Sequence, residues 1–269
     1  MSEKVAFVVP CHPPHYHFVN DFLDSFHKFG MEDQADVVLV LTNEADEKRF
    51  LEQPHGGENM QVGLMVLPPE YRNMINRNIP SIKKFYAIYQ LRKMYEYIIV
   101  IDAETIFKQR VDLKSVCEKF FREKILWGNR TNGRDPNIEF IKKSCARWFS
   151  YHPEKNKLES PLYLWFNQPC FYKTSMLDEF FRVTGLMNHL NSLSWSDFEY
   201  YMFMDYLILY HGFRTEDIGV ENNVSVCETR APLNVDKKNP DFKPLMCSRA
   251  ILEDLDNDEL FLVIHLDRK

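Results

Sequence analysis

The stretch YIIVIDAETIF, residues 97–107, decides the fold class of this chain. Residues 97–101 form a short continuous apolar run, which predicts a buried strand. Two carboxylates, Asp102 and Glu104, follow this run directly. Residues two apart in an extended chain face the same side, so we expect both carboxylates to point into one site at the strand end.

Apolar runs of the same kind precede this stretch and alternate with helical patterns. Strands are predicted at residues 5–10, 37–41 and 62–67, and helices at residues 15–29 and 80–94. This alternation predicts right-handed crossovers and a mostly parallel central sheet flanked by helices, which is an α/β fold. Ligands of such sheets bind beyond the carboxyl ends of the strands, so the segments after residues 10, 41 and 101 are expected to line one site.

The second half of the chain is less regular. A strand at residues 126–134 runs into a polar loop at 132–136, and a strand with a polar interruption is predicted at residues 165–172. Helices are predicted at 176–184 and 198–210. A last apolar strand, residues 260–265, ends on His265.

Composition limits the function classes. The chain has 269 residues, of which 45% are hydrophobic and 27% charged, so a single packed domain is expected. The formal net charge of −6 argues against nucleic acid as the main partner. Six scattered cysteines without a CxxC pair favour a reduced, cytoplasmic chain. We expect no signal peptide and no membrane span, since no apolar stretch reaches about 18 residues.

A strand that ends in Asp-x-Asp within an α/β chain of this size resembles the metal motif of GT-A glycosyltransferases. The motif here is the variant Asp102-Ala103-Glu104. The resemblance implies a single Rossmann-like GT-A domain, with the nucleotide sugar held by residues 1–125 and the acceptor by residues 126–269. It also implies a hexosyl- or pentosyltransferase that moves a sugar from a nucleotide donor, expected to be a UDP-sugar, to an oligosaccharide or other glycan.

The resemblance further implies a divalent cation, Mn²⁺ or Mg²⁺. Asp102 and Glu104 would hold it, together with His265 as a late histidine ligand, a donor type that suits manganese. A cation makes two close carboxylates tolerable and neutralises charge on a leaving diphosphate. The alternative is a purely structural role, in which Asp102 and Glu104 only begin a turn after the strand.

The donor nucleotide is expected to lie against the ends of the first strands and the helix before the Asp-Ala-Glu motif. The residues predicted to contact it are Pro10, Cys11, His12, Thr42, Asn43, Arg77, Lys83, Lys84, Asp102 and Ala103. Lys83 and Lys84 are also compatible with a solvated helix face. A zinc site around Cys11 and His12 lacks a second Cys/His cluster at ligand spacing.

The segment WSDFEYY, residues 195–201, resembles the Ser-Glu-Tyr-Glu segment of bacterial polysaccharide glycosyltransferases. Ser196 is predicted to cap a helix, with Glu199 at the third helical position as in a capping box. By the resemblance, Asp197 is the expected general base of an inverting enzyme and Glu199 the second candidate. Three residues are predicted to contact the substrate, namely Trp165, Asn167 and Gln168. Asn167-Gln168 resembles the Phe-Asn segment of retaining families, so a retaining enzyme stays open.

Two other functions stay open on the sequence. A sugar nucleotidyltransferase would carry a glycine-rich loop after the first strand, where this chain has Pro10-Cys11-His12-Pro13-Pro14. A catalytically silent carbohydrate- or nucleotide-binding protein on the same fold is the other alternative.

Overall fold

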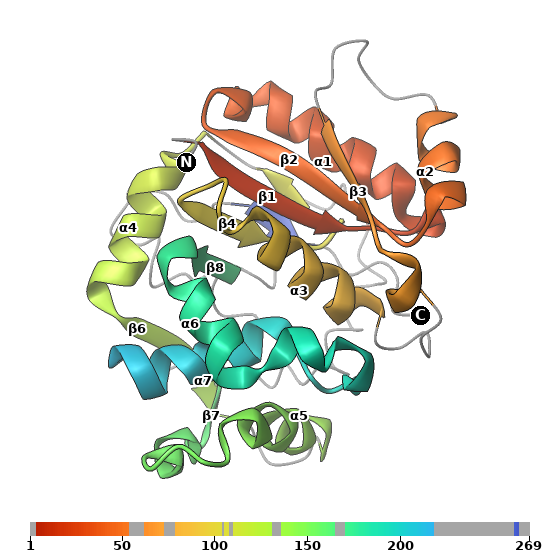
Figure 1. Cartoon of the computed structure of the whole chain (residues 1–269). Coiled ribbons are helices and arrows are strands. Elements are labelled where there is room, and N and C mark those ends of the chain that lie inside the picture. The colour runs from red at the N-terminus through yellow and green to blue at the C-terminus, as the bar shows by residue number, and fades with distance from the viewer. Residues whose placement is uncertain are drawn as a thin grey trace.

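The computed structural model describes residues 4–53, 62–72, 79–103, 105–107, 110–130, 136–164, 170–217 and 261–263. Five strands form the central sheet in the order β3-β2-β1-β4-β8 (Figure 1). Strands β1 to β4 are parallel, and β8 runs antiparallel to β4. Their bounds are β1 Val5–Pro10, β2 Ala35–Leu41, β3 Val62–Val66, β4 Tyr97–Val100 and β8 Cys170–Lys173. The predicted α/β fold with a mostly parallel sheet is therefore confirmed.

The central strands are buried because helices cover the sheet. Helices α1 (Tyr16–Lys28) and α3 (Ile79–Leu91) carry the apolar stripes that the sequence predicts, and both pack against the sheet region. Phe7 of β1 contacts three other rings edge-on, those of Phe22 and Phe26 on α1 and of Phe107 on β5 (Thr105–Phe107). This aromatic cluster fixes α1 against β1.

Other helices surround this core. Helix α7, almost entirely buried, lies between α5 and the central layers and contacts both α5 and α3 (Figure 1). The bounds of these helices are α2 Glu44–Leu51, α4 Leu113–Glu123, α5 Pro136–Ala146, α6 Thr174–Thr184 and α7 Glu199–His211. The short 3-10 helices of the described ranges are η1 Pro13–His15, η2 Met31–Asp33, η3 Pro69–Tyr71, η4 Arg147–Phe149, η5 Lys155–Leu158, η6 Leu186–Asn188 and η7 Leu190–Ser192. No helix within the described ranges is long and apolar enough to cross a membrane.

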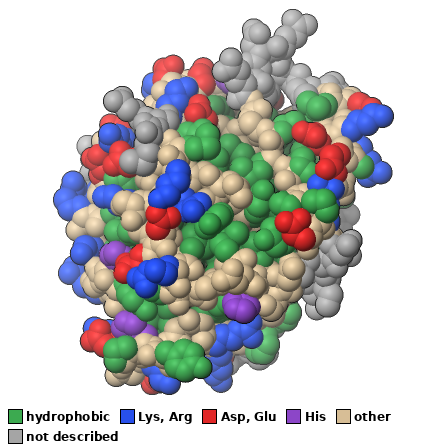
Figure 2. All heavy atoms as spheres, viewed as in Figure 1, with side chains coloured by type: hydrophobic (Ala, Val, Ile, Leu, Met, Phe, Trp, Pro, Cys, Tyr) green, Lys and Arg blue, Asp and Glu red, His purple; other side chains and the backbone are tan. Residues whose placement is uncertain are grey.

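Two small sheets complete the described structure. Strand β6 (Ile125–Arg130) pairs with β7 (Leu162–Tyr163) and β9 (Arg214–Asp217). Strand β5 (Thr105–Phe107) pairs antiparallel with β10 (Phe261–Val263), so the late predicted strand lies directly beside the chain that follows Asp102. Figure 2 shows acidic and basic side chains interspersed over one face of the molecule, with apolar side chains between them.

Candidate functional site

The carboxyl ends of β1 to β4 meet at one edge of the central sheet, because these four strands are parallel. Backbone hydrogen bonds extend the ladders past the strand ends, from Cys11 to Val40 and from Ile101 to Val8, each at 3.1 Å. The loops after β1, β2 and β4 are therefore held side by side, as the sequence predicts. Asp102 lies in the last of these loops.

A lysine connects two carboxylates at this edge. The ammonium group of Lys84, on α3, lies 3.1 Å from Asp102 Oδ1 and 3.1 Å from Glu199 Oε1. Asp102 follows β4, whereas Glu199 opens α7, so this group ties three elements together. The Glu199 side chain is only 3% exposed and that of Asp102 is 37% exposed. Asp102 is thus the member of the cluster that solvent or a ligand reaches most easily.

The charges of this cluster depend on one another. Burial alone would lower the pKa of Lys84, but the carboxylates of Asp102 and Glu199 outweigh it and raise that pKa, so the ammonium stays charged. Burial raises the pKa of Glu199, and Lys84 opposes that effect. At the start of β8, burial raises the pKa of the Cys170 thiol well above its usual value. The charge of Glu199 raises this pKa further, and the charge of Lys84 lowers it. The cluster therefore combines the charged ammonium group of Lys84, the partly exposed carboxylate of Asp102 and the buried carboxyl group of Glu199, whose pKa is raised.

Asp197 has a different environment from Glu199, although only one residue, Phe198, separates them. Its buried carboxylate accepts five hydrogen bonds. The donors are Ser144 Oγ, Trp148 Nε1, Arg147 Nη2, and both the backbone nitrogen and Oγ of Ser194. Since a carboxylate offers about four lone-pair directions, none is left for an acceptor hydroxyl. The base role of Asp197 stays a prediction, and this geometry argues for a structural role.

The predicted capping box at the start of α7 is wrong. Helix α7 begins at Glu199, and its N-cap is Phe198, which makes no side-chain capping hydrogen bond. Ser196 lies outside the helix, and Glu199 turns to Lys84 instead of reaching back to a capping residue. The physical reason is tertiary, because an ion pair across the sheet edge replaces the local hydrogen bond of a capping box.

Lys83 and Asn43 support the loops of this edge from inside. Lys83 is buried and donates from Nζ to the carbonyl oxygen of Cys11 at 2.6 Å, and burial lowers its pKa to about 8. Asn43 caps α2 by accepting from the backbone nitrogen of Asp46 at 2.9 Å. Both side chains are thus engaged with the protein, and their predicted contacts with a nucleotide stay predictions.

The other predicted nucleotide contacts lie on the same loops with different exposure. His12 is exposed at the start of η1, Pro10 and Thr42 are half-buried, and Ala103 is buried. Cys11 is buried, and burial raises the pKa of its thiol to about 12. His12 and Thr42 are therefore the side chains of these loops best placed to meet a ligand.

Six predicted site residues lie outside the described residues. They are Arg77, Glu104, Trp165, Asn167, Gln168 and His265. Within the described ranges, no group of three or more His, Cys, Asp or Glu side chains is arranged to hold a metal ion. Asp102 falls within those ranges, whereas the other two predicted ligands do not, so the metal site stays a prediction.

Sequence reasoning missed the pairing of Lys84 with Asp102 and Glu199. A signal for it exists in the helix, because adjacent residues point about 100° apart around the axis. Lys83 and Lys84 are adjacent on α3, so both cannot lie in the middle of one solvated face. The partners of Lys84 come from positions 18 and 115 residues further along the chain, and no local pattern points to them.

No family model and no curated protein matches this chain. Among solved structures, it is similar to the apo structure of the WbbM bifunctional glycosyltransferase, with 11% identity and a TM-score of 0.48, over 98% of this chain and 46% of that one. It is also similar to S. aureus TarS, with 15% identity and a TM-score of 0.39, over 80% of this chain and 35% of that one. A structure of TarS 1–349 in complex with UDP gives 15% identity and a TM-score of 0.31, over 49% of this chain and 37% of that one.

The chain spans less than half the length of each of these structures. The α/β fold rests on the strand order and pairing described above.

Proposed function

We propose that this chain is a glycosyltransferase that moves a sugar from a nucleotide donor, a UDP-sugar, to a glycan acceptor. The observation that supports this most is the cluster of Lys84, Asp102 and Glu199 at the carboxyl edge of the parallel sheet. This is the edge where α/β sheets bind their ligands, and the loops after β1 and β2 end beside it. The resemblance of Asp102-Ala103-Glu104 to the GT-A metal motif favours sugar transfer from a nucleotide donor as the reaction.

The carboxylate of Asp102 fits a divalent cation. Carboxylate oxygen is a ligand type of both Mg²⁺ and Mn²⁺, and this side chain is open enough to be reached. Asp102 would hold the cation, with Glu104 and His265 as the further ligands that the sequence predicts. When bound, the cation supplies positive charge that stabilises the leaving nucleoside diphosphate.

Lys84 supplies a second, permanent positive charge at the same edge. Its ammonium group is held by Glu199, a partner that is buried and therefore fixed in place. A cation that is already in position stabilises negative charge in the transition state without reorganising. We therefore assign Lys84 to positioning Asp102 and to stabilising the charge of the donor phosphates.

Glu199 has the chemical setting of a general base. Burial raises the pKa of its carboxyl group above the usual value, and a raised pKa makes a carboxylate a stronger base. Asp197, in contrast, is saturated by five donors. Between the two carboxylates that the sequence nominates, we therefore place Glu199 first. A carboxylate base near the acceptor corresponds to an inverting enzyme.

The test is thermal unfolding of the full chain with UDP and a panel of UDP-sugars, each with and without Mn²⁺. Ligands that bind the native state raise the melting temperature by mass action. We expect a shift with UDP that grows with Mn²⁺, and release of UDP from one UDP-sugar when a glycan acceptor is added. In Asp102→Asn the Mn²⁺-dependent part of the shift should disappear.

Asp178→Asn is the matched control, because Asp178 is also a carboxylate paired with basic side chains, Arg92 and Lys93, beyond the other end of α3. If Asp102→Asn and Asp178→Asn respond alike to UDP and Mn²⁺, Asp102 does not hold the metal. Binding of UDP-sugars without turnover on any acceptor would instead favour a silent nucleotide-binding protein.

A further inference from the structure

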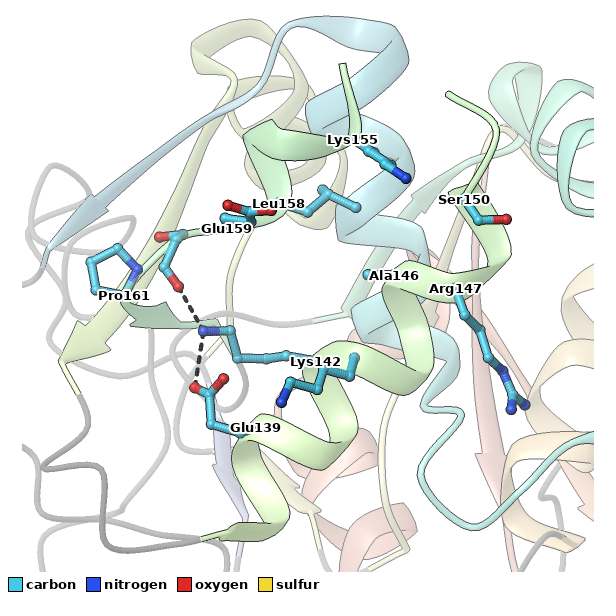
Figure 3. A pocket seen from close by; sticks show the side chains of 11 residues that line it. Glu139, Lys142, Ala146, Arg147, Ser150, Lys155, Leu158, Glu159 and Pro161 are labelled. Carbon is cyan, nitrogen blue, oxygen red and sulfur yellow. Dashed lines mark hydrogen bonds and ion pairs between the residues drawn. The ribbon is translucent and has the colours of Figure 1, made fainter. Parts of the chain in front are cut away.

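A pocket of about 740 Å³ lies away from the sheet edge, between α5 and the segment of residues 155–161 (Figure 3). Helix α5 and the turn after it supply one wall, and η5 with the residues that follow it supplies the other. The lining residues are Glu139, Lys142, Lys143, Ala146, Arg147, Ser150, Lys155, Leu158, Glu159, Ser160 and Pro161. Neither the sequence pattern nor the proposed donor site accounts for this pocket.

Two of the four basic side chains in the pocket already have partners. Lys142 donates to Glu139 Oε1 at 3.2 Å and to the carbonyl oxygen of Ser160 at 2.6 Å. Arg147 pairs with Asp197 at 2.7 Å. In Figure 3, Lys142 lies against Glu139, and the head of Arg147 points away from the segment that carries Lys155. These two charges are therefore neutralised within the protein.

The other two basic side chains are not neutralised. Lys143 and Lys155 are both exposed, and neither ammonium group makes an ion pair or hydrogen bond to another described residue. They come from opposite walls, and in Figure 3 the side chain of Lys155 extends into the space between η5 and α5. Against them stands one carboxylate without a described partner, that of Glu159. The pocket therefore carries an excess of positive charge in a chain whose net charge is −6.

The size and lining of the pocket favour an organic ligand over a simple ion. Sites for small molecules range from about 300 to about 1,000 Å³, and a lone phosphate would fill only a small part of this one. The hydroxyl group of Ser150 and the partly buried side chain of Leu158 add polar and apolar surface to the same walls. A carbohydrate chain presents the same mixture of hydroxyl groups and apolar ring faces.

We propose that this pocket binds an acidic oligosaccharide, with Lys143 and Lys155 pairing with carboxylate or phosphate groups of that oligosaccharide. The proposal rests on the proposed transferase function only where it identifies this oligosaccharide as the acceptor. Arg147 connects the two regions, since it lines the pocket and pairs with Asp197, two residues before Glu199.

The test is isothermal titration calorimetry on the full chain with an oligogalacturonide, and with a neutral oligosaccharide of the same length. We expect the acidic chain to bind more tightly, with an affinity that falls as salt rises. Lys143→Ala and Lys155→Ala should each weaken binding by about two- to fivefold, the range for a partly exposed charge pair. Glu159→Gln should tighten binding by a similar factor, because it removes the opposing carboxylate.

Lys157→Ala is the matched control. Lys157 lies two residues from Lys155 on the same short helix, but it does not line the pocket and pairs with Glu154 at 2.8 Å. Both variants change the net charge of the chain equally. If Lys157→Ala weakens binding as much as Lys155→Ala does, the effect is one of overall charge and the pocket proposal fails. Equal binding of acidic and neutral chains overturns it as well.

Inorganic phosphate, titrated alone, separates the two sources of negative charge. If phosphate binds as tightly as the oligogalacturonide and with the same dependence on Lys143 and Lys155, the site is a simple anion site and the carbohydrate assignment is wrong. The UDP titration distinguishes this result from failure of the transferase proposal. If the protein binds the acidic oligosaccharide through Lys143 and Lys155 but binds no UDP-sugar, the pocket proposal is supported. The proposal that this oligosaccharide is the acceptor of a transferase is then wrong.

Discussion

Replacing Lys84 by methionine removes the ammonium group that bridges Asp102 and Glu199, while the new side chain keeps most of the apolar stem. The two ion pairs differ in burial, because the Glu199 side chain is 3% exposed and that of Asp102 is 37% exposed. Loss of one partner from a buried pair costs about 3–5 kcal/mol, since the other charge is left uncompensated. The exposed pair adds at most about 1 kcal/mol. We therefore expect Lys84→Met to lose about 3 kcal/mol of unfolding free energy near neutral pH.

The loss should depend on pH in a definite direction. Burial raises the pKa of Glu199 even when Lys84 is present, and without Lys84 the largest effect that opposes this rise is lost. A carboxyl group whose folded pKa lies above its unfolded value favours the folded state at low pH, and that contribution disappears as pH rises through the folded pKa. Lys84→Met should therefore be closest to the wild type near pH 5 and furthest from it near pH 8. Urea unfolding at both pH values measures the difference.

Two further variants make this prediction refutable. Lys84→Met combined with Glu199→Gln should recover most of the lost stability, because replacing both members of a buried pair is often nearly neutral. Lys93→Met is the control, since Lys93 pairs with Asp178 at the surface, where both side chains are more than half exposed. It should cost less than about 1 kcal/mol. The reasoning is refuted if Lys84→Met costs no more than Lys93→Met at pH 8, or if the double variant is no more stable than the single one.

Three further predictions concern buried groups. Burial lowers the pKa of Lys83 to about 8, so in the unfolded chain, where it titrates near 10.4, this lysine keeps its proton to higher pH. The unfolding free energy of the wild type, measured in urea, should therefore rise relative to that of Lys83→Met as pH rises from 8 toward 10. Asp197→Ala should lose about 3 kcal/mol by leaving its buried donors unpaired. If Asp197→Asn instead stays fully stable and loses sugar transfer, Asp197 is the base. Site-resolved mass spectrometry of the native chain at pH 8 should find four thiols slow to react with iodoacetamide, because burial raises the pKa of each: Cys11, Cys117, Cys145 and Cys170.

The first half of the fold follows from local sequence patterns. Strand β1 spans Val5–Pro10, the same bounds as the apolar run that predicts it. Helix α1 spans Tyr16–Lys28, within one residue at each end of the predicted range, because its phenylalanines repeat at helical spacing and Gly30 follows. Both patterns extend over a few residues only, so these two elements can be predicted without knowing how the rest of the chain packs.

The site follows from the sequence only in part. The position of Asp102 at the end of a parallel strand is local, and it was predictable from residues 97–107 alone. The environment of Asp197 is not local, since Ser144, Arg147 and Trp148 donate to it from about 50 residues earlier in the chain. The local sequence Ser-Asp-Phe-Glu does not distinguish between carboxylates that cap a helix and carboxylates that accept from distant donors. The competition between these outcomes is decided by the packing of α5 against α7.

The start of α7 joins the two proposed sites. Asp197 pairs with Arg147, which lines the pocket, and Glu199 pairs with Lys84 at the sheet edge. Two carboxylates of one short segment therefore face opposite halves of the chain. Under the two proposals, an acceptor and a donor would share this segment as a common boundary, and alignment of two reactants requires such a boundary. It also means that a substitution in residues 197–199 disturbs both sites at once. The two sites can be separated only through residues that take no part in this boundary, Lys143 and Lys155 on one side and Asp102 on the other.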